Sequence, residues 1–307
     1  MGSGVFEGVT ASTIILLLQK ENDKEKRDNN KAIIISDLNN LKDKKSITQS
    51  EFLKNTSYAF NITLDKSERK IFDVIDKDTI SLGEITIIHA GGIATGPNKG
   101  KMIENRKKND KYKPMLEGKD IKPYYPLFAN RYILYERKLL YRPREEQIFL
   151  SSEKLITQRI GGGNKALVVS YDNKQYYTFN STNIILSKNN HFSLKFLLTL
   201  LNSSLINWYY TNKFTNKSTL TVNISKTFLE QLPIKNIPLE KQLPFIKLAD
   251  KMLSLNKKLQ EIGDKNTLEK QKIQEEIKKT DNEIDELVYQ LYEITEEEKK
   301  IIEESLK

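Results

Sequence analysis

Two glycine-rich loops that carry basic and amide side chains are the parts of this sequence best suited to binding chemistry. The first, His89 to Lys101, reads HAGGIATGPNKGK, and the second, Arg159 to Lys165, reads RIGGGNK. Bare glycine backbone lets a ligand approach closely, and backbone amides beside lysines suit a phosphate. A nucleotide-binding P-loop does not fit, because Gly96 and Gly100 are too close and no hydroxyl residue follows Lys101. An ordinary turn without a ligand is the alternative for each loop.

The flanks of the second loop offer side chains that can recognise bases. Gln158, Arg159, Asn164 and Lys165 are all hydrogen-bond donors. Arginine and glutamine pair bidentately with the edges of guanine and adenine. A third basic stretch, Arg137 to Arg144, is interleaved with an aromatic residue, which favours phosphate contact or else a solvated surface.

Most catalytic chemistry finds no support in the composition. The chain has no cysteine and only two histidines, His89 and His191, far apart in the sequence. These counts exclude a disulfide framework and thiolate chemistry, and they argue against a His/Cys metal site. Neither histidine lies in a setting for acid–base or nucleophilic catalysis. We therefore assign no catalytic residue and no metal ligand.

The excess positive charge is confined to the middle of the chain. Residues 99–238 contain 24 Lys and Arg residues against 10 Asp and Glu residues, whereas the flanking segments are near neutral or acidic. Such segregation favours a polyanionic partner, with a solubilising surface as the alternative. The residues that we predict to contact double-stranded DNA are Thr95, Asn98, Lys99, Lys101, Lys119, Arg142, Arg144, Gln158, Arg159, Asn164, Lys165 and Lys213.

Hydrophobic periodicity predicts an α+β fold in three parts. The expected parts are residues 1–80 with edge strands and a linker, a sheet-rich domain over 81–238, and an antiparallel helical hairpin over 239–307. Apolar stripes on either side of Gly263–Asn266 predict the hairpin. The other predicted elements are a buried strand at Thr13–Leu18, a charged loop at Glu21–Lys31, a strand at Lys31–Ser36, a helix at Lys66–Ile75, strands at Ile85–Ile88, Tyr132–Tyr135, Lys154–Gln158, Ala166–Tyr171 and Gln175–Phe179, a hairpin turn at Asp172–Lys174, and one buried helix at Phe192–Tyr210 with Tyr209 and Tyr210 in the core.

Several motifs occur in an order that resembles a known family. They are the Gly92–Lys99 loop, Leu116–Ile121 (LEGKDI), Lys154–Arg159, Phe179–Asn183, the Leu200–Leu205 stretch LLNSSL with the later Leu232–Pro233, and Ile284–Tyr292 followed by Thr295–Glu298. Together they resemble the TaqI-like C-terminal specificity domain of adenine-specific DNA methyltransferases and restriction–modification enzymes. Val5–Thr10 is similar to the last strands of that family's methyltransferase domain.

The resemblance implies recognition of duplex DNA without catalysis by this chain. The family's Asn/Asp-Pro-Pro-Tyr/Phe motif and its glycine-rich cofactor motif are both absent from the sequence. We therefore expect no cofactor here, S-adenosylmethionine being bound by a methyltransferase part elsewhere. The implied partners are double-stranded DNA and a methyltransferase, with a nuclease domain or subunit as a further possibility, so the chain resembles a piece or a split subunit of a larger enzyme.

Two other functions remain open from the sequence. A helical scaffold for protein assembly would make the basic charge incidental, and a free-standing enzyme would require a bound cofactor. No apolar run reaches the roughly 18 residues needed to span a membrane, and no signal peptide is visible, so we expect a cytoplasmic protein without membrane contact.

Overall fold

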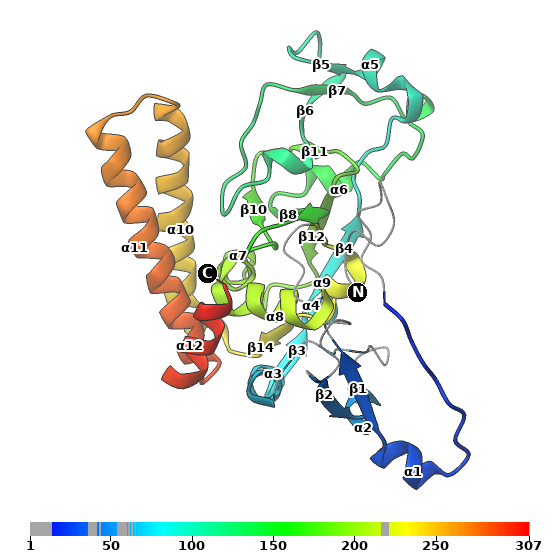
Figure 1. The fold of residues 1–307 in the computed structure, drawn as a ribbon. Helices are drawn as coiled ribbons and strands as arrows, with labels where there is room; N and C mark the ends of the chain where they lie inside the picture. The colour runs from blue at the N-terminus through cyan, green and yellow to red at the C-terminus, as the bar shows by residue number, and fades with distance from the viewer. Residues whose placement is uncertain are drawn as a thin grey trace. The chain divides into compact units, whose positions relative to one another are not determined.

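The computed structural model describes residues 14–35, 42, 44–53, 60, 62, 64, 66–215 and 221–306. The chain divides into two compact units, Met1–Leu64 and Asp65–Lys307. Figure 1 shows the elements of both units along the chain. The similarity of Val5–Thr10 to methyltransferase strands lies outside the described residues.

The first unit is built on one antiparallel strand pair. β1 (Lys31–Ile35) pairs with β2 (Lys44–Thr48), so the strand predicted at Lys31 is confirmed and its partner strand was missed. α1 (Lys24–Asn29) lies within the predicted charged loop and is capped by the Asp23 carboxylate, and α2 (Ser50–Leu53) follows β2. The buried strand predicted at Thr13–Leu18 is wrong for the described part, because Ile14–Leu18 form no strand and are exposed.

A four-stranded antiparallel sheet forms the centre of the second unit. Its strand order is β10–β8–β12–β4, from Val169–Asp172, Lys154–Gln158, Thr182–Ser187 and Thr86–Ala90. Leu155, Ile156, Ile184 and Ile185 are fully buried, as expected for strands covered on both faces. Helix α7 (Leu194–Asn202) packs against β10 and β8.

The helix predicted over Phe192–Tyr210 is interrupted at Ser203. α7 ends at Asn202 and α8 (Ser204–Phe214) begins immediately afterwards. Ser203 has an extended backbone, and its hydroxyl accepts from the Ile206 amide and so caps α8. Tyr209 and Tyr210 are buried, as predicted.

A second sheet carries the segments that lead to the candidate site. Its order is β11–β6–β7–β5, from Tyr177–Thr178, Tyr112–Leu116, Tyr132–Leu134 and Ile103–Glu104, and β11 pairs with β6 in parallel. The predicted hairpin at Asp172–Lys174 is therefore wrong. Asp172 binds the amides of Lys174 and Tyr176 through its carboxylate, and the chain passes from the first sheet into the second.

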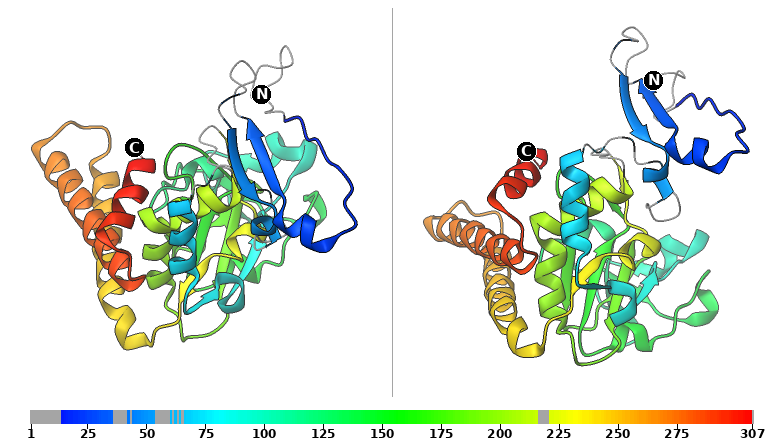
Figure 2. Two further views of the ribbon diagram at one scale, coloured as in Figure 1. Left: turned by 60° about the horizontal axis from the view of Figure 1, so that its bottom comes forward. Right: turned by 90° about the horizontal axis from the view of Figure 1, so that it is seen from below.

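The C-terminal part contains the predicted hairpin and one further helix. α10 (Leu239–Ile262) and α11 (Leu268–Leu291) pack against each other along one side of the unit (Figure 1), and Gly263 provides the reversal with a φ of 67°. α12 (Glu296–Ser305) was not predicted, and it packs against α8 and α3. Figure 2 shows the hairpin and the second sheet at opposite ends of this unit.

None of the described helices is long and apolar enough to cross a membrane.

Short elements complete the second unit. They are α3 (Lys66–Asp76), which confirms the predicted helix, and β3 (Thr79–Ser81), α4 (Leu82–Ile85), η2 (Gly96–Asn98), α5 (Lys99–Met102), η3 (Gly118–Asp120), η4 (Arg137–Leu139), α6 (Gln147–Leu150), β9 (Ile160–Gly161), β13 (Val222–Asn223), α9 (Lys226–Leu229) and β14 (Pro233–Lys235).

Candidate nucleic-acid interface

The first glycine-rich loop is held tightly against the turn that follows β11. β4 ends at Ala90, and the amides of Gly92 and Ile93 donate to the carbonyls of Phe179 and Thr178 at 3.2 and 2.7 Å. A Cβ atom at Gly92 would lie only 2.0 Å from the Thr178 carbonyl oxygen, so this crossing needs glycine. The loop therefore has a defined path rather than the freedom of an ordinary surface turn.

Backbone hydrogen bonds bring a basic segment alongside this loop. The amides of Tyr141 and Arg142 both donate to the Ala94 carbonyl, at 3.0 and 3.2 Å. Two residues further on, the Arg144 guanidinium donates to the Ala90 carbonyl. Arg142 and Arg144 are thereby placed beside Gly91, which has a φ of 73°.

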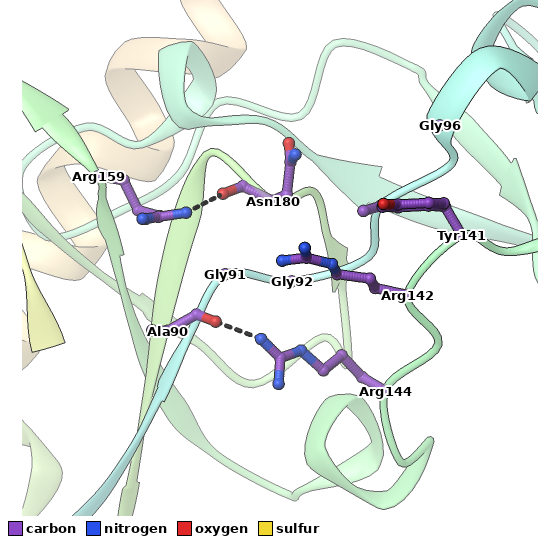
Figure 3. Close-up of a pocket in the computed structure, with 10 residues that line it drawn as sticks. Ala90, Gly91, Gly92, Gly96, Tyr141, Arg142, Arg144, Arg159 and Asn180 are labelled. Carbon is purple, nitrogen blue, oxygen red and sulfur yellow. Dashed lines mark hydrogen bonds between the residues drawn. The ribbon is translucent and has the colours of Figure 1, made fainter.

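A third arginine reaches the same place from the other side. The Arg159 amide donates to the Ser181 carbonyl at 2.9 Å, and its Nη1 donates to the Asn180 carbonyl at 3.3 Å. In Figure 3, Arg159 extends toward the Gly91–Gly92 backbone from one side of the view, and Arg142 and Arg144 extend toward it from the other, Arg142 above that backbone and Arg144 below it. These side chains line a cavity of about 320 Å³ together with Ala90, Gly91, Gly92, Ala94, Gly96, Tyr141 and Asn180, and we call it the arginine pocket.

The arginine pocket carries uncompensated positive charge. Three of its ten lining residues are arginines and none is an aspartate or a glutamate. The Nε atoms of Arg144 and Arg159 are buried without a hydrogen-bond partner within the described structure. Buried guanidinium donors without acceptors are costly unless a ligand supplies them. The pocket is thus suited to an anion or to a group rich in acceptors.

The positive field of the pocket also acts on a neighbouring histidine. His89 is half-buried on β4, directly before Ala90. Its pKa is lowered from the usual 6.5, first by burial and then by the charges of Arg144 and Lys226. The imidazole is therefore held neutral at neutral pH.

Two of the predicted lysines bind one carboxylate next to the pocket. Lys99 and Lys119 lie 3.2 and 3.4 Å from the Glu117 carboxylate oxygens, and Arg131 also contacts it. Burial opposes ionisation of Glu117, but the hydrogen bond from Lys99 and the nearby charges of Arg131 and Lys119 leave its pKa below the usual value. Both lysines remain more than half exposed, so they are still accessible to a second anion.

Comparison with protein-family models identifies the central part of the chain. Residues 113–234 match the model of the TaqI-like C-terminal specificity domain. This segment is similar to that family. The resemblance inferred from the sequence is confirmed, and the coarse role of such a domain is recognition of the target of a restriction–modification system. The matched family is one of specificity domains.

Several solved structures are also similar, at low identity. A type IIL restriction-modification enzyme, MmeI, in complex with DNA is 10% identical over 72% of this chain and 35% of that chain, with a TM-score of 0.46. The HsdS subunit from Thermoanaerobacter tengcongensis is 12% identical over 74% of this chain and 50% of that chain, with a TM-score of 0.37. A type I R-M system chain is 15% identical over 74% and 45%, with a TM-score of 0.38. This chain spans half or less of these proteins, and no curated protein matches it.

The motif LEGKDI within the specificity domain has a clear structural role. The Gly118 amide donates to the Ser181 hydroxyl at 2.8 Å, and a Cβ atom at Gly118 would lie 2.8 Å from the Ser181 carbonyl. Asp120 accepts from the Glu117 amide and from Arg131. The motif therefore fixes the turn at Asn180–Ser181, whose carbonyls hold Arg159 in the arginine pocket.

The other residues predicted to contact DNA lie in separate parts of the structure. Lys165 lies 3.3 Å from Asp281 and 3.7 Å from Asp285 on α11, and Lys213 lies 3.0 Å from Asp76 on α3. The remaining residues vary in exposure: Thr95 is buried, Gln158 is half-buried, Lys101 and Asn164 are exposed, and the side chain of Asn98 lies outside the described structure.

Sequence reasoning did not select two residues of the arginine pocket. Tyr141 and Asn180 line it, and Asn180 contributes its carbonyl rather than its side chain to Arg159. No local pattern marks a backbone carbonyl as a ligand, so only its position inside a matching motif pointed to this turn. Across the described residues, no cluster of three His, Cys, Asp or Glu side chains is arranged to hold a metal ion.

Proposed function

We propose that this chain recognises a specific sequence in duplex DNA for a restriction–modification enzyme that modifies adenine. The observation that carries the proposal is the match of residues 113–234 to a specificity-domain family. The excess of basic residues between 99 and 238 supports the same partner, because DNA is the polyanion on which such systems act.

Two kinds of contact divide the work of recognition in this proposal. Exposed lysines such as Lys99, Lys101 and Lys119 bind phosphates, which gives affinity and sets the register on the duplex. Gln158 and Asn164, on either side of the glycines Gly161–Gly163, are our candidates for reading base edges. We assign these roles to residues 81–238, with the hairpin over 239–307 as their support and residues 1–80 as the connection to the rest of the enzyme.

The proposal assigns catalysis to another domain or subunit. The sequence contains neither the catalytic motif nor the cofactor motif that the methyltransferase family would require. A methyltransferase partner therefore binds S-adenosylmethionine and flips the target base out of the duplex, as enzymes that modify a paired base must. A nuclease is a second possible partner, and action on cellular DNA implies a cytoplasmic location.

Fluorescence anisotropy at several salt concentrations tests the proposal. Each neutralised phosphate contributes about −0.9 to the slope of log K against log salt, so about five contacts predict a slope near −4 to −5. Duplexes with the preferred site and random duplexes are compared at each concentration. Salt-independent binding would contradict the proposal. So would the lack of binding at low salt, even with the methyltransferase partner added.

A further inference from the structure

We infer that the arginine pocket binds a single phosphate group of the DNA backbone and fixes the position of the specificity domain along the duplex. This inference rests on the proposed function, because it names the chemical group that one site of the domain takes. It differs from the sequence-based interpretation, which assigned Arg159 to base reading.

The orientation of the guanidinium groups supports one shared ligand. Arg144 is anchored to the Ala90 carbonyl and Arg159 to the Asn180 carbonyl, so neither side chain needs to be ordered when a ligand arrives. Arg142 has one side next to the Tyr141 ring, whose centroid is 5.5 Å from its Cζ, and its guanidinium extends over the Gly91–Gly92 backbone (Figure 3). Preordered donors lose little entropy on binding.

Gly91 leaves the space between two of the arginines open. A Cβ atom built at this residue would lie 3.7 Å from Nη2 of Arg144 and 3.7 Å from Nη1 of Arg159. Both guanidinium groups therefore border the same small volume, and any side chain at Gly91 would intrude on it. Charge-assisted hydrogen bonds from arginine to a phosphate oxygen need such an unobstructed approach.

The charge balance favours a phosphate over a base edge. Recognition of guanine uses the fork of one arginine and leaves its charge in place, because the base is neutral. Here three cations converge and the residues lining the pocket include no carboxylate. A phosphodiester offsets that charge and supplies acceptors for the guanidinium groups that line the pocket.

Single methylphosphonate substitutions in a duplex carrying the preferred site test the inference directly. Each substitution neutralises one phosphate, so a scan along both strands should reveal one position at which wild-type affinity falls about tenfold. In Arg142→Gln and Arg159→Gln the unmodified duplex should bind about tenfold more weakly on site and random DNA alike, with a salt slope shallower by about 1. The methylphosphonate at the critical position should then cause little further loss.

Arg137→Gln is the matched control. This arginine lies in the same basic segment but outside the pocket, paired with Glu145 at 3.1 Å. The control should keep the full methylphosphonate penalty. Melting temperatures of all variants report whether the fold is retained.

Three results would overturn the inference while leaving DNA recognition intact. They are an undiminished methylphosphonate penalty in both pocket variants, unchanged affinity in both, or a selective loss on the preferred site, which would make the pocket a base reader. If the wild type binds no duplex, the proposed function fails, and inorganic phosphate becomes the probe. Phosphate should raise the melting temperature of the wild type more than chloride does at equal ionic strength, and this difference should vanish in Arg159→Gln. No difference in the wild type would overturn the phosphate assignment as well.

Discussion

The ammonium group of Lys154 lies 2.6 Å from the Asp172 carboxylate, and neither side chain is exposed to solvent. This pair joins the start of β8 to the end of β10, and Lys154 also donates to the Phe149 carbonyl at 2.7 Å. Asp172 in turn holds the amides of Lys174 and Tyr176, at the point where the chain leaves the first sheet. One buried ion pair therefore directs the path that brings β11 and the Asn180 turn to the arginine pocket.

Breaking this ion pair on one side should be strongly destabilising. Asp172→Asn leaves a buried ammonium without its counter-charge, and we expect the free energy of unfolding to fall by about 3–5 kcal/mol. Burial already lowers the pKa of Lys154, against the attraction of Asp172. The double variant Lys154→Met with Asp172→Asn should lose less than the sum of the two single variants. Urea unfolding of the four proteins measures the difference, and strictly additive losses would show that the pair is not coupled.

Lys165 should contribute to the packing of the hairpin more than to DNA affinity. It faces Asp281 and Asp285 on α11, where burial raises the pKa of Asp285 and the charge of Lys165 opposes that rise. Lys165→Met should lower the free energy of unfolding by about 1 kcal/mol or less, because the lysine is partly exposed. Its affinity for duplex DNA should stay within about twofold of wild type, measured beside Lys101→Met as an exposed comparison. A tenfold loss of affinity at unchanged stability would return Lys165 to the DNA interface.

His89 should make DNA affinity depend on pH. Its pKa lies below 6.5 in the free protein, so acidification through that pKa protonates it beside Arg144 and adds positive charge near the arginine pocket. Affinity for duplex DNA should therefore rise as pH falls, by a few-fold more in the wild type than in His89→Gln. Equal pH dependence in both proteins would remove His89 from this role.

The same histidine has an opposite effect on stability. The lowered pKa means that the folded protein binds fewer protons at His89 than the unfolded chain does. The contribution of His89 to the free energy of unfolding is therefore fully present above pH 6.5. It is lost as the pH falls from 6.5 through the lower pKa of His89 in the folded protein. Urea unfolding at several pH values should show a shallower decline below pH 6.5 in His89→Gln than in the wild type.

The purified chain should not bind S-adenosylmethionine, and it should not transfer a methyl group to DNA. The expectation follows from the missing catalytic and cofactor motifs in the sequence. Calorimetric titration with the cofactor measures binding, and a methylation assay on duplex DNA measures transfer. Micromolar affinity for the cofactor would contradict the division of labour that we propose.

Periodic elements were accessible from the sequence because local patterns encode them. The short apolar run of β8 at Lys154–Gln158 and the apolar stripes of α10 and α11 predicted those elements closely. The interruption at Ser203 was missed because a serine that caps one helix looks, in a periodic pattern, like a tolerated polar residue. A hairpin at Asp172–Lys174 was predicted wrongly. The observed path depends on the ion pair between Asp172 and Lys154 and on the pairing of β11 with β6, whose residues lie far away in the sequence.

The residue types of the candidate site could be predicted from the sequence, but which of these residues lie together in the fold could not. Arg142 and Arg144 were selected from a basic stretch and Arg159 from its place beside the glycines, but only backbone hydrogen bonds to Ala94 and Ser181 bring them together. Lys213 was also selected as a basic residue, and its partner Asp76 lies 137 positions away. Sequence reasoning detects a charge and cannot detect a distant side chain that binds it.

Selection from a randomised duplex library tests sequence-specific recognition most directly. The full chain, with its methyltransferase partner added if affinity requires it, is mixed with the library at low salt, and bound duplexes are recovered and sequenced over successive rounds. Our account predicts enrichment of one short sequence that is bound more tightly than random DNA by at least about 4 kcal/mol, the lower range for specific recognition. A bound pool identical in composition to the starting library, or no retained duplex under either condition, would contradict it.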